Sequence, residues 1–318
     1  MPSSAIRHLA ICLPAHDEAD SLRTLLPEID GAVENLGVKR VSVFVFDDGS
    51  RDGTADVVRS ARLSNAEVFL IHSLVRVGKT SGLQNCVSVA LEDGADAVVM
   101  MDADGQDDPA YIRGLLTQLE SGLDVVNGRR TNRAHGLGKK ISSRAFNAVV
   151  RRVSGEKIWD VNSGLKGFSR RGAENLLPYF YGELHRVLII IAVWLGLSVG
   201  EIPVANRPRS AGSTKYGVAR GWRGLFDLAT IQFLRRYHSR PGHFFIGIGV
   251  FLVLLGAVFF GLGLASAASG GFFGVLVWGG IFLSGFGFIF VSFGFLSELM
   301  LFLLKAPVTP VTTVTRVA

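Results

Sequence analysis

The sequence has few cysteines and no apolar stretch at its start, and each shortage excludes a class of protein. Its 318 residues include only two cysteines, Cys12 and Cys86, which lack the spacing of a zinc site. We expect both to be buried free thiols, because they provide no disulfide framework and fit a reducing compartment. The first residues, Met1-Pro2-Ser3-Ser4, contain no signal-peptide core, so we expect that the large domain is not exported.

Two further absences concern nucleotides and nucleic acids. The formal net charge of +6 suits nucleic acid, anionic lipid or phosphorylated ligands. No motif typical of RNA- or DNA-binding proteins accompanies that charge, so we expect no nucleic-acid partner. No glycine-rich phosphate loop with basic residues follows the first expected strand, which disfavours a nucleotidyltransferase.

Charge is absent from most of the chain after residue 243. Residues 244–265 are 22 consecutive residues without a charged side chain, long enough to cross the hydrocarbon core of a bilayer. A short stretch of small residues, 266–271, separates them from a second apolar run at 273–297. We therefore predict a two-helix transmembrane hairpin over 244–304.

Basic residues flank this hairpin on one side only. Arg235, Arg236, Arg240 and Lys305 lie outside the two runs, whereas the connection between them has no charge. The positive-inside rule then puts both ends in the cytoplasm, with 305–318 as a cytoplasmic tail on a multi-pass inner-membrane protein. The glycines of the two runs permit close helix contact, either within the hairpin or in a homo-oligomer. Glu298, the only acid in this part of the chain, is expected at the membrane interface.

The first part of the chain alternates between two kinds of segment. This alternation, with apolar runs that are continuous, is typical of an α/β fold in which helices cover both faces of a mostly parallel sheet. We expect strands at 8–14, 41–47, 67–72, 97–103 and 124–127 and helices near 18–36, 53–63, 79–92 and 109–121. Asp108 and Pro109 suit the start of the last of these helices.

Basic and apolar residues are interleaved in two later segments. Residues 129–153 and 217–243 both combine arginines with large apolar side chains, as interfacial amphipathic helices do. A solvated helix packed on the domain is the alternative for 129–153. We assign 1–216 to a catalytic domain and 217–243 to an interfacial helix and linker.

Two acidic clusters end expected strands. Asp47-Asp48 closes one apolar run, and Asp102-Ala103-Asp104 closes another. Ligands bind at the carboxyl ends of strands in open α/β sheets. Four carboxylates within residues 102–108 repel one another unless a cation is present, and such oxygen ligands suit Mg²⁺ or Mn²⁺ together with substrate phosphates. These clusters indicate an enzyme acting on a nucleotide diphosphate.

The motifs resemble those of a known enzyme family. The segments that carry the resemblance are Pro14-Ala15-His16-Asp17-Glu18, Asp47-Asp48-Gly49-Ser50, Asp102-Ala103-Asp104-Gly105-Gln106, Asp160-Val161-Asn162-Ser163-Gly164-Leu165-Lys166-Gly167-Phe168, Glu183-Leu184-His185-Arg186 and Arg207-Pro208-Arg209-Ser210-Ala211-Gly212-Ser213-Thr214-Lys215-Tyr216. Together they resemble the inverting family 2 glycosyltransferases, in particular the branch that transfers sugars to polyprenyl phosphate. The resemblance covers about residues 8–240 and implies a GT-A fold.

The resemblance also implies roles for individual residues. It implies binding of the donor nucleotide by Pro14, His16, Glu18, Asp48, Lys79 and Asp102. It implies a Mg²⁺ or Mn²⁺ ion held by Asp102, Asp104 and Gln106, with Asp104 and Asp160 as catalytic residues. It implies contacts with acceptor or donor phosphates for Arg129, Lys140, Ser143, Arg209 and Lys215. Asp17 replaces the asparagine often found before Glu18, and Thr214 departs from the commoner pattern before Lys215.

The implied reaction needs little proton transfer. A lipid monophosphate has a second pKa of about 6, so at neutral pH it is largely a dianion. The dianion can attack the anomeric carbon of the sugar without a strong base. Basic residues and a metal would bring the two anions together and stabilise the leaving diphosphate. Asp160 is the best candidate for a base or for positioning the acceptor, and a structural salt bridge to a nearby arginine is an equal alternative.

Other functions stay open. Transfer to a different membrane lipid is one alternative, although the basic residues favour a phosphate acceptor. A non-catalytic membrane scaffold of the same fold is another, against which the intact Asp102, Asp104 and Gln106 argue. A processive polysaccharide synthase is disfavoured because none of the four tryptophans follows the Gln-x-x-Arg pattern of that group. A UDP-sugar donor is preferred over a GDP-sugar by analogy with bacterial members.

Overall fold

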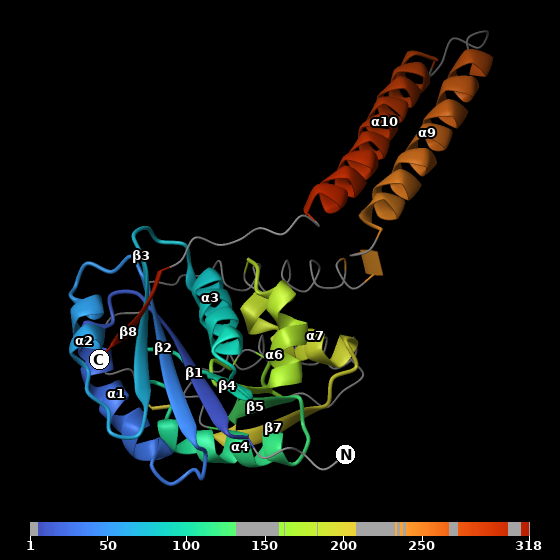
Figure 1. Ribbon diagram of the computed structural model, residues 1–318. Helices are drawn as coiled ribbons and strands as arrows, with labels where there is room; N and C mark the ends of the chain where they lie inside the picture. The colour runs from blue at the N-terminus through green and yellow to red at the C-terminus, as the bar shows by residue number, and fades with distance from the viewer. Residues whose placement is uncertain are drawn as a thin grey trace. The chain divides into compact units, whose positions relative to one another are not determined.

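The computed structural model describes residues 6–131, 159–161, 163–182, 184–207, 233, 236–237, 240–266, 273–304 and 313–317. The chain divides into two compact units, Met1–Asp227 with Val311–Ala318, and Leu228–Pro310. The first unit contains the sheet, and the second contains two long apolar helices (Figure 1).

The first unit is built on an eight-stranded mixed sheet with the order β7-β5-β6-β4-β1-β2-β3-β8. Its strands are β1 (His8–Ala15), β2 (Arg40–Asp48), β3 (Glu67–Ser73), β4 (Ala97–Met100), β5 (Val125–Arg130), β6 (Lys166–Ser169), β7 (Val199–Val204) and β8 (Thr313–Val317). Strands β4, β1, β2 and β3 run parallel to one another, as do β5 and β7. Strand β6 is antiparallel to β4 and β5, and β8 is antiparallel to β3.

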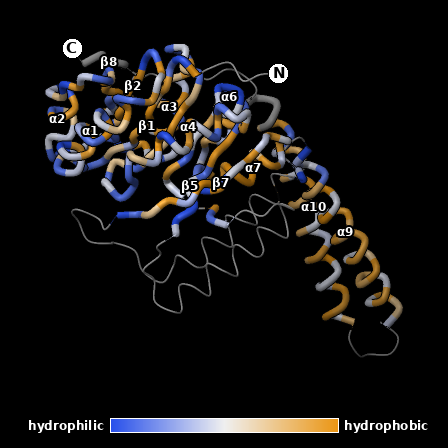
Figure 2. Tube along the Cα trace, turned by 90° about the horizontal axis from the view of Figure 1, so that it is seen from below, coloured by the Kyte–Doolittle hydropathy of each residue, from blue (hydrophilic) through white to orange (hydrophobic). Residues whose placement is uncertain are grey.

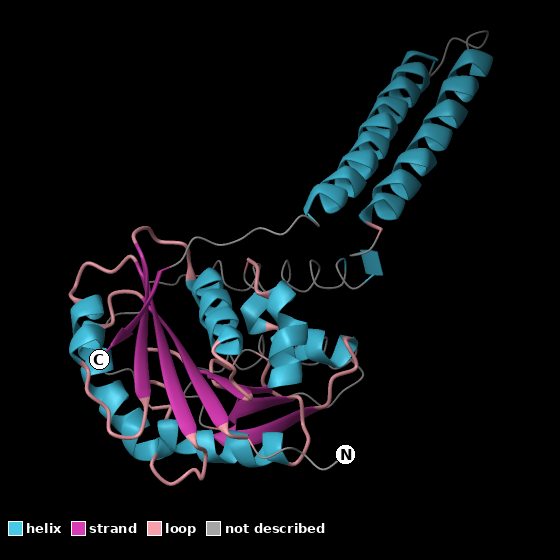
Figure 3. Cartoon of the chain, viewed as in Figure 1, coloured by secondary structure: helices cyan, strands magenta, loops and turns pink. Residues whose placement is uncertain are grey.

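Helices cover both faces of this sheet, as the alternation of segments predicts (Figure 3). One apolar core joins the sheet to α1 (Ala19–Val33), α2 (Thr54–Ser60) and α4 (Ile112–Glu120). On the other face lie α3 (Lys79–Glu92) and α6 (Arg170–Leu176), and the Cys86 thiol lies 3.6 Å from the Phe44 carbonyl oxygen. Cys12 and Cys86 are buried free thiols, as predicted.

The remaining short elements of this unit complete the sheet's surroundings. They are the 3₁₀ turns η1 (Pro109–Tyr111), η2 (Leu177–Tyr179) and η3 (Leu184–Arg186) and the helix α7 (Leu188–Trp194). Asp108 caps η1 as expected, because its carboxylate accepts a hydrogen bond from the Ala110 amide at 2.9 Å.

The observed strands differ from the predicted ones at several places. The strand predicted at 97–103 ends at Met100, because Asp102 begins the acidic turn and leaves the ladder. Strand β6 was not expected, since its four residues include a lysine and carry no alternating pattern. Burial between two strands, rather than local sequence, makes it a strand.

The end of the chain contributes an edge strand to the sheet. Residues 313–317 pair with β3, with Thr313 opposite His72 and Val317 opposite Val68. The parallel strand β3 therefore has a partner on both sides, and its backbone groups are not left as an open edge.

The second unit consists of α9 (Pro241–Ser266) and α10 (Phe273–Leu304). Within them, residues 241–266 and 273–300 are long and apolar enough to cross a membrane, with hydropathies of 2.7 and 2.0. Only 11% of the most apolar window of each is buried inside the structure, and both helices are hydrophobic over most of their length (Figure 2). A helix buried in the core of a soluble domain would not be exposed in this way.

The two helices pack through glycines that recur every seven residues. A Cβ atom built on Gly249 would lie 2.6 Å from the carbonyl oxygen of Gly287, and one on Gly256 would lie 2.6 Å from that of Gly280. Only residues without a side chain allow backbones to approach so closely. These glycines therefore serve packing within the hairpin, one of the two explanations left open by the sequence. No described residue lies within 4 Å of a Cβ atom built on Gly247.

Glu298 also links the two helices. Its Oε1 accepts a hydrogen bond of 3.0 Å from the backbone amide of Gly242, in the first turn of α9. The first amides of a helix have no partner inside the helix, so this carboxylate caps α9 from α10.

Candidate active site

The acidic clusters lie together at the carboxyl edge of the parallel strands. β1 and β2 are neighbours, and β4 lies on the other side of β1 (Figure 1). Asp48 is the last residue of β2, and Asp102 follows β4 by two residues. The sheet therefore brings together the residues that the sequence assigns to donor binding.

Asp48 holds the loop between β3 and α3. Its carboxylate is 4% exposed and accepts hydrogen bonds from the amides of Val77, at 2.6 Å, and Gly78, at 3.0 Å. The ring of His16 contacts the Asp48 carbonyl oxygen through Nδ1 at 2.8 Å. Asp48 thus fixes the start of α3, and with it Lys79, relative to the end of β1.

The turn after β1 depends on the unusual residue Asp17. Its φ of 55° lies in the left-handed region, which Asn and Asp adopt more readily than other residues with a side chain. Its carboxylate accepts a hydrogen bond of 2.9 Å from the Arg51 amide, and its own amide donates to the Ser50 hydroxyl at 3.0 Å. Aspartate therefore provides the turn geometry at a position where asparagine is common.

Asp52 has the turn-capping role that the sequence favours for it. It accepts hydrogen bonds from the amides of Ala19 and Thr54 and from the Thr54 hydroxyl. Burial alone would raise the pKa of Asp52, but these hydrogen bonds outweigh burial and hold the pKa below its usual value. Asp52 thus joins the start of α1 to the start of α2.

Lys79 and Asp102 form an ion pair at the centre of this edge. Lys79 Nζ lies 2.5 Å from Asp102 Oδ1. Burial opposes the charge on both groups, but each charge stabilises the other, so the pKa of Asp102 is lowered and that of Lys79 is raised. Lys79 thus provides a positive charge beside the first of the clustered carboxylates.

The rest of the acidic turn is held from within. Asp107 is 4% exposed, and its Oδ2 accepts a hydrogen bond of 3.1 Å from the Asp102 amide. Burial, and then the charge of Asp102, raises the pKa of Asp107 to about 7. Asp104 Oδ1 accepts from the Gln106 amide at 3.1 Å. Asp102 is thus held by Lys79 and by the turn itself, and Asp104 by the amide of Gln106.

Asp160 is paired with an arginine that the sequence did not single out. Arg130 donates to both carboxylate oxygens, from Nε at 2.8 Å and from Nη2 at 3.1 Å, and its amide donates at 3.2 Å. Asp160 is only 2% exposed. Asp160 therefore forms the salt bridge to a nearby arginine that the sequence left open, and its role in the reaction stays a prediction. The neighbouring Arg129 lies over the ring of Trp159, with 5.9 Å between its guanidinium carbon and the ring centre.

A small cavity beside Asp102 contains two further functional candidates, Lys166 and His185. Its lining includes Lys79, Asp102 and Ser163 as well as these two residues. Lys166 is 1% exposed and donates a hydrogen bond to the Ser163 carbonyl oxygen. Burial, opposed in part by the charge of Asp160, lowers the pKa of Lys166 to about 8.

His185 has a defined protonation state in this cavity. Burial and then the charges of Lys79 and Lys166 lower its pKa to about 3, so the ring is neutral at pH 7. The Thr80 hydroxyl donates to the Gly182 carbonyl oxygen, so we assign Nδ1–H of His185 as the donor to Thr80 Oγ1, at 2.7 Å. Nε2 is then an unprotonated acceptor. Lys166 and His185 belong to the motifs at 160–168 and 183–186, but their burial could not be predicted from the sequence.

The remaining predicted residues are only partly located. Pro14 belongs to β1, and Glu18 precedes α1 and accepts a hydrogen bond of 2.9 Å from the Ser21 hydroxyl. The other four predicted phosphate-binding residues lie outside the described residues: Lys140, Ser143, Arg209 and Lys215. Just before that last region, Arg207 pairs with Glu28 and with Asp108, at 2.5 and 2.9 Å, and its amide donates to the Gln106 carbonyl oxygen.

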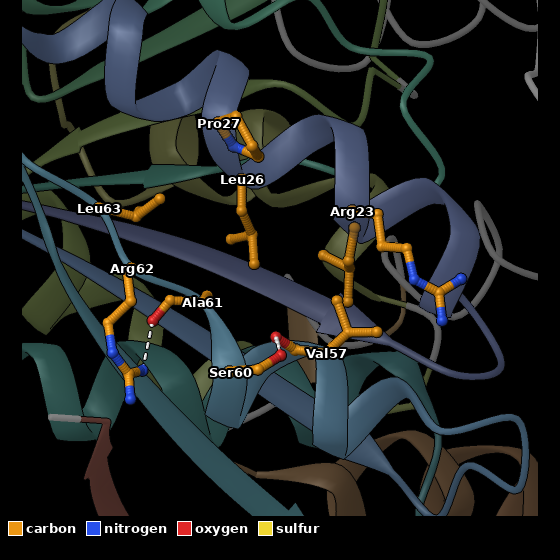
Figure 4. A pocket seen from close by; sticks show the side chains of 9 residues that line it. Arg23, Leu26, Pro27, Val57, Ser60, Ala61, Arg62 and Leu63 are labelled. Atoms are coloured by element: carbon orange, nitrogen blue, oxygen red, sulfur yellow. Dashed lines mark hydrogen bonds between the residues drawn. The ribbon is translucent and has the colours of Figure 1, made fainter.

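A second pocket lies between α1 and α2 (Figure 4). Leu22, Leu26 and Val57 provide its apolar wall, and Arg23 and Arg62 lie at its side. None of the predicted site residues that the structure describes lines it, and its lining includes no carboxylate. We therefore assign the chemistry to the carboxyl edge of the sheet.

Comparisons with known proteins agree with this location. Residues 10–177 match the model of glycosyl transferase family 2. The chain is 30% identical over 259 residues to a dodecaprenyl-phosphate galacturonate synthase of Rhizobium johnstonii, covering 78% of this chain and 74% of that protein. It is 27% identical over 229 residues to an undecaprenyl-phosphate 4-deoxy-4-formamido-L-arabinose transferase of Salmonella paratyphi A, covering 72% and 68%.

Solved structures share the fold. One is glucosyl-3-phosphoglycerate synthase of Mycobacterium tuberculosis in complex with Mn²⁺, uridine diphosphate and phosphoglyceric acid, with a TM-score of 0.50, 18% identity, and coverage of 70% of this chain and 78% of that chain. A mycobacterial protein gives a TM-score of 0.51 at 20% identity, covering 70% and 74%. The sheet is thus of the GT-A type expected from the motifs. With the family match over residues 10–177, the chain belongs to glycosyl transferase family 2 and is a glycosyltransferase.

Proposed function

We propose that this chain transfers a sugar, with inversion, from a nucleotide diphosphate sugar to polyprenyl phosphate. The observation that carries the proposal is the Lys79–Asp102 pair at the carboxyl edge of a family 2 sheet, beside the loop held by Asp48. Two similar enzymes have names that specify dodecaprenyl and undecaprenyl phosphate, and two candidate membrane spans suit a lipid acceptor. UDP-sugars are the preferred donors, with GDP-sugars as the alternative.

The proposed step exchanges one bond at the anomeric carbon. An oxygen of the lipid phosphate forms a bond to that carbon as the bond to the nucleoside diphosphate breaks, giving a polyprenyl-phosphate sugar. Because the phosphate is largely a dianion near pH 7, no proton has to be removed from it. The engagement of both Asp160 oxygens with Arg130 suits a positioning role better than that of a base.

The cationic side chains would act on the two anionic reactants. Lys79, Arg130 and Lys166 provide three cations around Asp102 and Asp160, and two of them have limited exposure. Fixed charges in a poorly solvated site stabilise developing negative charge more strongly than they would in water. In this proposal, Lys79 holds the donor diphosphate, and Arg130 holds an acceptor or donor phosphate.

The acidic turn fits a divalent metal by the chemistry of its donors. Asp102, Asp104 and Gln106 offer the carboxylate and amide oxygens that Mg²⁺ and Mn²⁺ prefer. Among the described residues no group of three or more acidic, histidine or cysteine side chains is already arranged around a metal position. Lys79 occupies one Asp102 oxygen, so a metal would bind in competition with it. When bound, the metal would neutralise charge on the leaving diphosphate.

The membrane arrangement is part of the proposal. The candidate spans would anchor the chain in the cytoplasmic membrane, with the basic flanks Arg240 and Lys305 and the catalytic unit on the cytoplasmic side. A homo-oligomer stays a prediction, because Gly249 and Gly256 pack against α10 of the same chain.

The test is a transfer assay with the full chain in detergent. Undecaprenyl phosphate is incubated with labelled UDP- and GDP-sugars, with Mg²⁺ or Mn²⁺ or with EDTA, and then extracted into organic solvent. We expect lipid-phase label that disappears with EDTA and in Asp104→Ala, but persists in Asp20→Ala, whose carboxylate is 83% exposed at the surface of α1.

Three other results would contradict the proposal. Label on diacylglycerol or ceramide, but not on undecaprenyl phosphate, would favour a different lipid acceptor. Sugar transfer that EDTA does not inhibit would show that the reaction requires no divalent metal. Absence of both turnover and metal-dependent donor binding, measured by calorimetry on the same preparation, would favour a scaffold of the same fold.

A further inference from the structure

The loop between β3 and α3 exposes three large aliphatic side chains within four residues. Leu74 is 90% exposed, Val75 67% and Val77 44%, and the intervening Arg76 is also exposed. Single exposed apolar residues are common on soluble proteins, whereas adjacent ones mark an interaction surface.

The backbone of this loop is held in place, so the exposure is a property of its fixed conformation. The Val77 amide donates to Asp48 at 2.6 Å, and the Ser73 hydroxyl donates to the Val75 carbonyl oxygen at 2.7 Å. Gly49 approaches the loop so closely that a Cβ atom there would lie 3.1 Å from the Arg76 amide nitrogen. With its backbone anchored on β2, the loop presents its aliphatic side chains outward.

The path of the chain connects this loop to the candidate spans. Only eight residues, 305–312, separate the end of α10 from β8. Strand β8 begins at Thr313, which pairs with His72, two residues before Leu74. The chain that leaves the second candidate span therefore joins the sheet next to the exposed loop.

We propose that residues 74–77 contact the lipid surface of the membrane that holds α9 and α10. Aliphatic side chains around one arginine suit that surface, because the apolar groups enter the acyl boundary while the guanidinium remains among anionic headgroups. Since Asp48 holds this loop, its contact with lipid brings the carboxyl edge of the sheet to the place where a lipid acceptor resides.

Two other occupants are less consistent with the residues present. A nucleoside base usually stacks on an aromatic ring or on arginine, and this loop has no aromatic residue and a single arginine. A second copy of the chain would cover the aliphatic side chains equally well, but it would also bring two Arg76 side chains of like charge together. Both become outcomes of the experiment.

The experiment places an environment-sensitive NBD fluorophore on the loop of the full chain. Cys12 and Cys86 are buried, so Leu74→Cys provides the reactive thiol. The matched control is Ser64→Cys, an exposed position before the opposite end of the same strand. Both proteins are reconstituted in vesicles of phosphatidylethanolamine and phosphatidylglycerol, with and without lipids that carry a nitroxide in the acyl chain.

We expect blue-shifted emission and several-fold quenching by nitroxide lipids at position 74, and neither at position 64. Quenching equal at both positions, or absent at 74, would overturn the proposal. A spectral change at 74 only on adding UDP would assign the loop to the nucleoside, and one that depends only on protein density in the vesicles would assign it to a second copy. Flotation of the vesicles verifies anchoring, and the result does not depend on the sugar or acceptor of the proposed reaction.

Discussion

Lys79 Nζ lies 2.5 Å from Asp102 Oδ1, and this contact joins the first turn of α3 to the turn after β4. The lysine follows the loop that Asp48 holds, so three strand ends determine the position of one cation. The pair gives Asp102 a cationic partner before any metal or diphosphate binds. A metal or a donor diphosphate would therefore bind to a site in which Lys79 already contacts Asp102.

Replacement of Lys79 tests whether this cation acts on the donor. We expect Lys79→Met to reduce kcat/KM by about 10²–10³-fold, the range for the loss of one group that stabilises transition-state charge. The thermal midpoint should change little, because the side chains of Lys79 and Asp102 are 40% and 33% exposed and solvent screens such pairs. Steady-state kinetics and a thermal scan of the same preparation check this, with Lys79→Arg as the charge-retaining control. Unchanged kinetics in Lys79→Met would exclude the role.

The same contact predicts competition between Lys79 and a metal. Because Nζ occupies an Asp102 oxygen, Lys79→Met should bind Mn²⁺ more tightly than the wild type when no donor is present. Electron paramagnetic resonance of free Mn²⁺ measures this affinity directly. Asp102→Asn should abolish the difference. Equal affinities in the wild type and Lys79→Met would show that the metal uses other oxygens.

The Arg130–Asp160 pair allows positioning to be separated from base catalysis. Asp160 is almost completely buried, so Arg130→Ala, which removes the arginine paired with it, should destabilise the chain by roughly 3–5 kcal/mol. If the pair only positions phosphates, Asp160→Asn and Arg130→Gln should lower activity without moving the pH–rate profile, and their effects should not add in the double variant. Loss of the acidic limb of that profile in Asp160→Asn alone would instead identify a base.

The glycine row of the hairpin can be tested with a control in the same helix. Gly249→Val should destabilise the hairpin by about 1–3 kcal/mol, because the added atoms meet Gly287 and Val291. Gly247→Val, two residues away, meets nothing within 4 Å and should have little effect. Thermal aggregation of the full chain in detergent compares the two variants. Equal effects would mean that the glycines face a different partner.

Much of the fold follows from patterns that are local in sequence. The continuous apolar runs predict β1, β2 and β3 almost to the residue, because parallel strands buried on both faces need such runs. Strand β6 depends on two neighbours that are distant in sequence, so no local pattern reveals it. Strand β8 could not be predicted for the same reason, because residues 313–317 form a strand only by pairing with the edge of β3.

The candidate site divides in a similar way. Asp48 and Asp102 are recognisable because acids at strand ends have a known use in α/β folds. Arg130 and Lys166 were missed because their importance lies in burial next to Asp160 and Asp102, which sequence spacing does not report. His185 belongs to a recognised motif, but its tautomer depends on Thr80, 105 residues away.

Lys166 gives the clearest test of whether a buried charge is kept for function. Its pKa in the folded chain is about 8, below the usual 10.5, so the folded state holds this proton less tightly than the unfolded state. Below pH 8 both states are protonated and the penalty of burial is complete, whereas stability rises with pH between about 8 and 10.5 as only the folded state releases the proton. Lys166→Met should therefore be more stable than the wild type near pH 7, by roughly 3 kcal/mol at most, and the advantage should shrink toward pH 10. Thermal scans across this pH range measure the difference, and the transfer assay should show reduced activity in the more stable variant. If Lys166→Met is less stable than the wild type and fully active, the charge of Lys166 is not kept for function, and the lysine stabilises the fold.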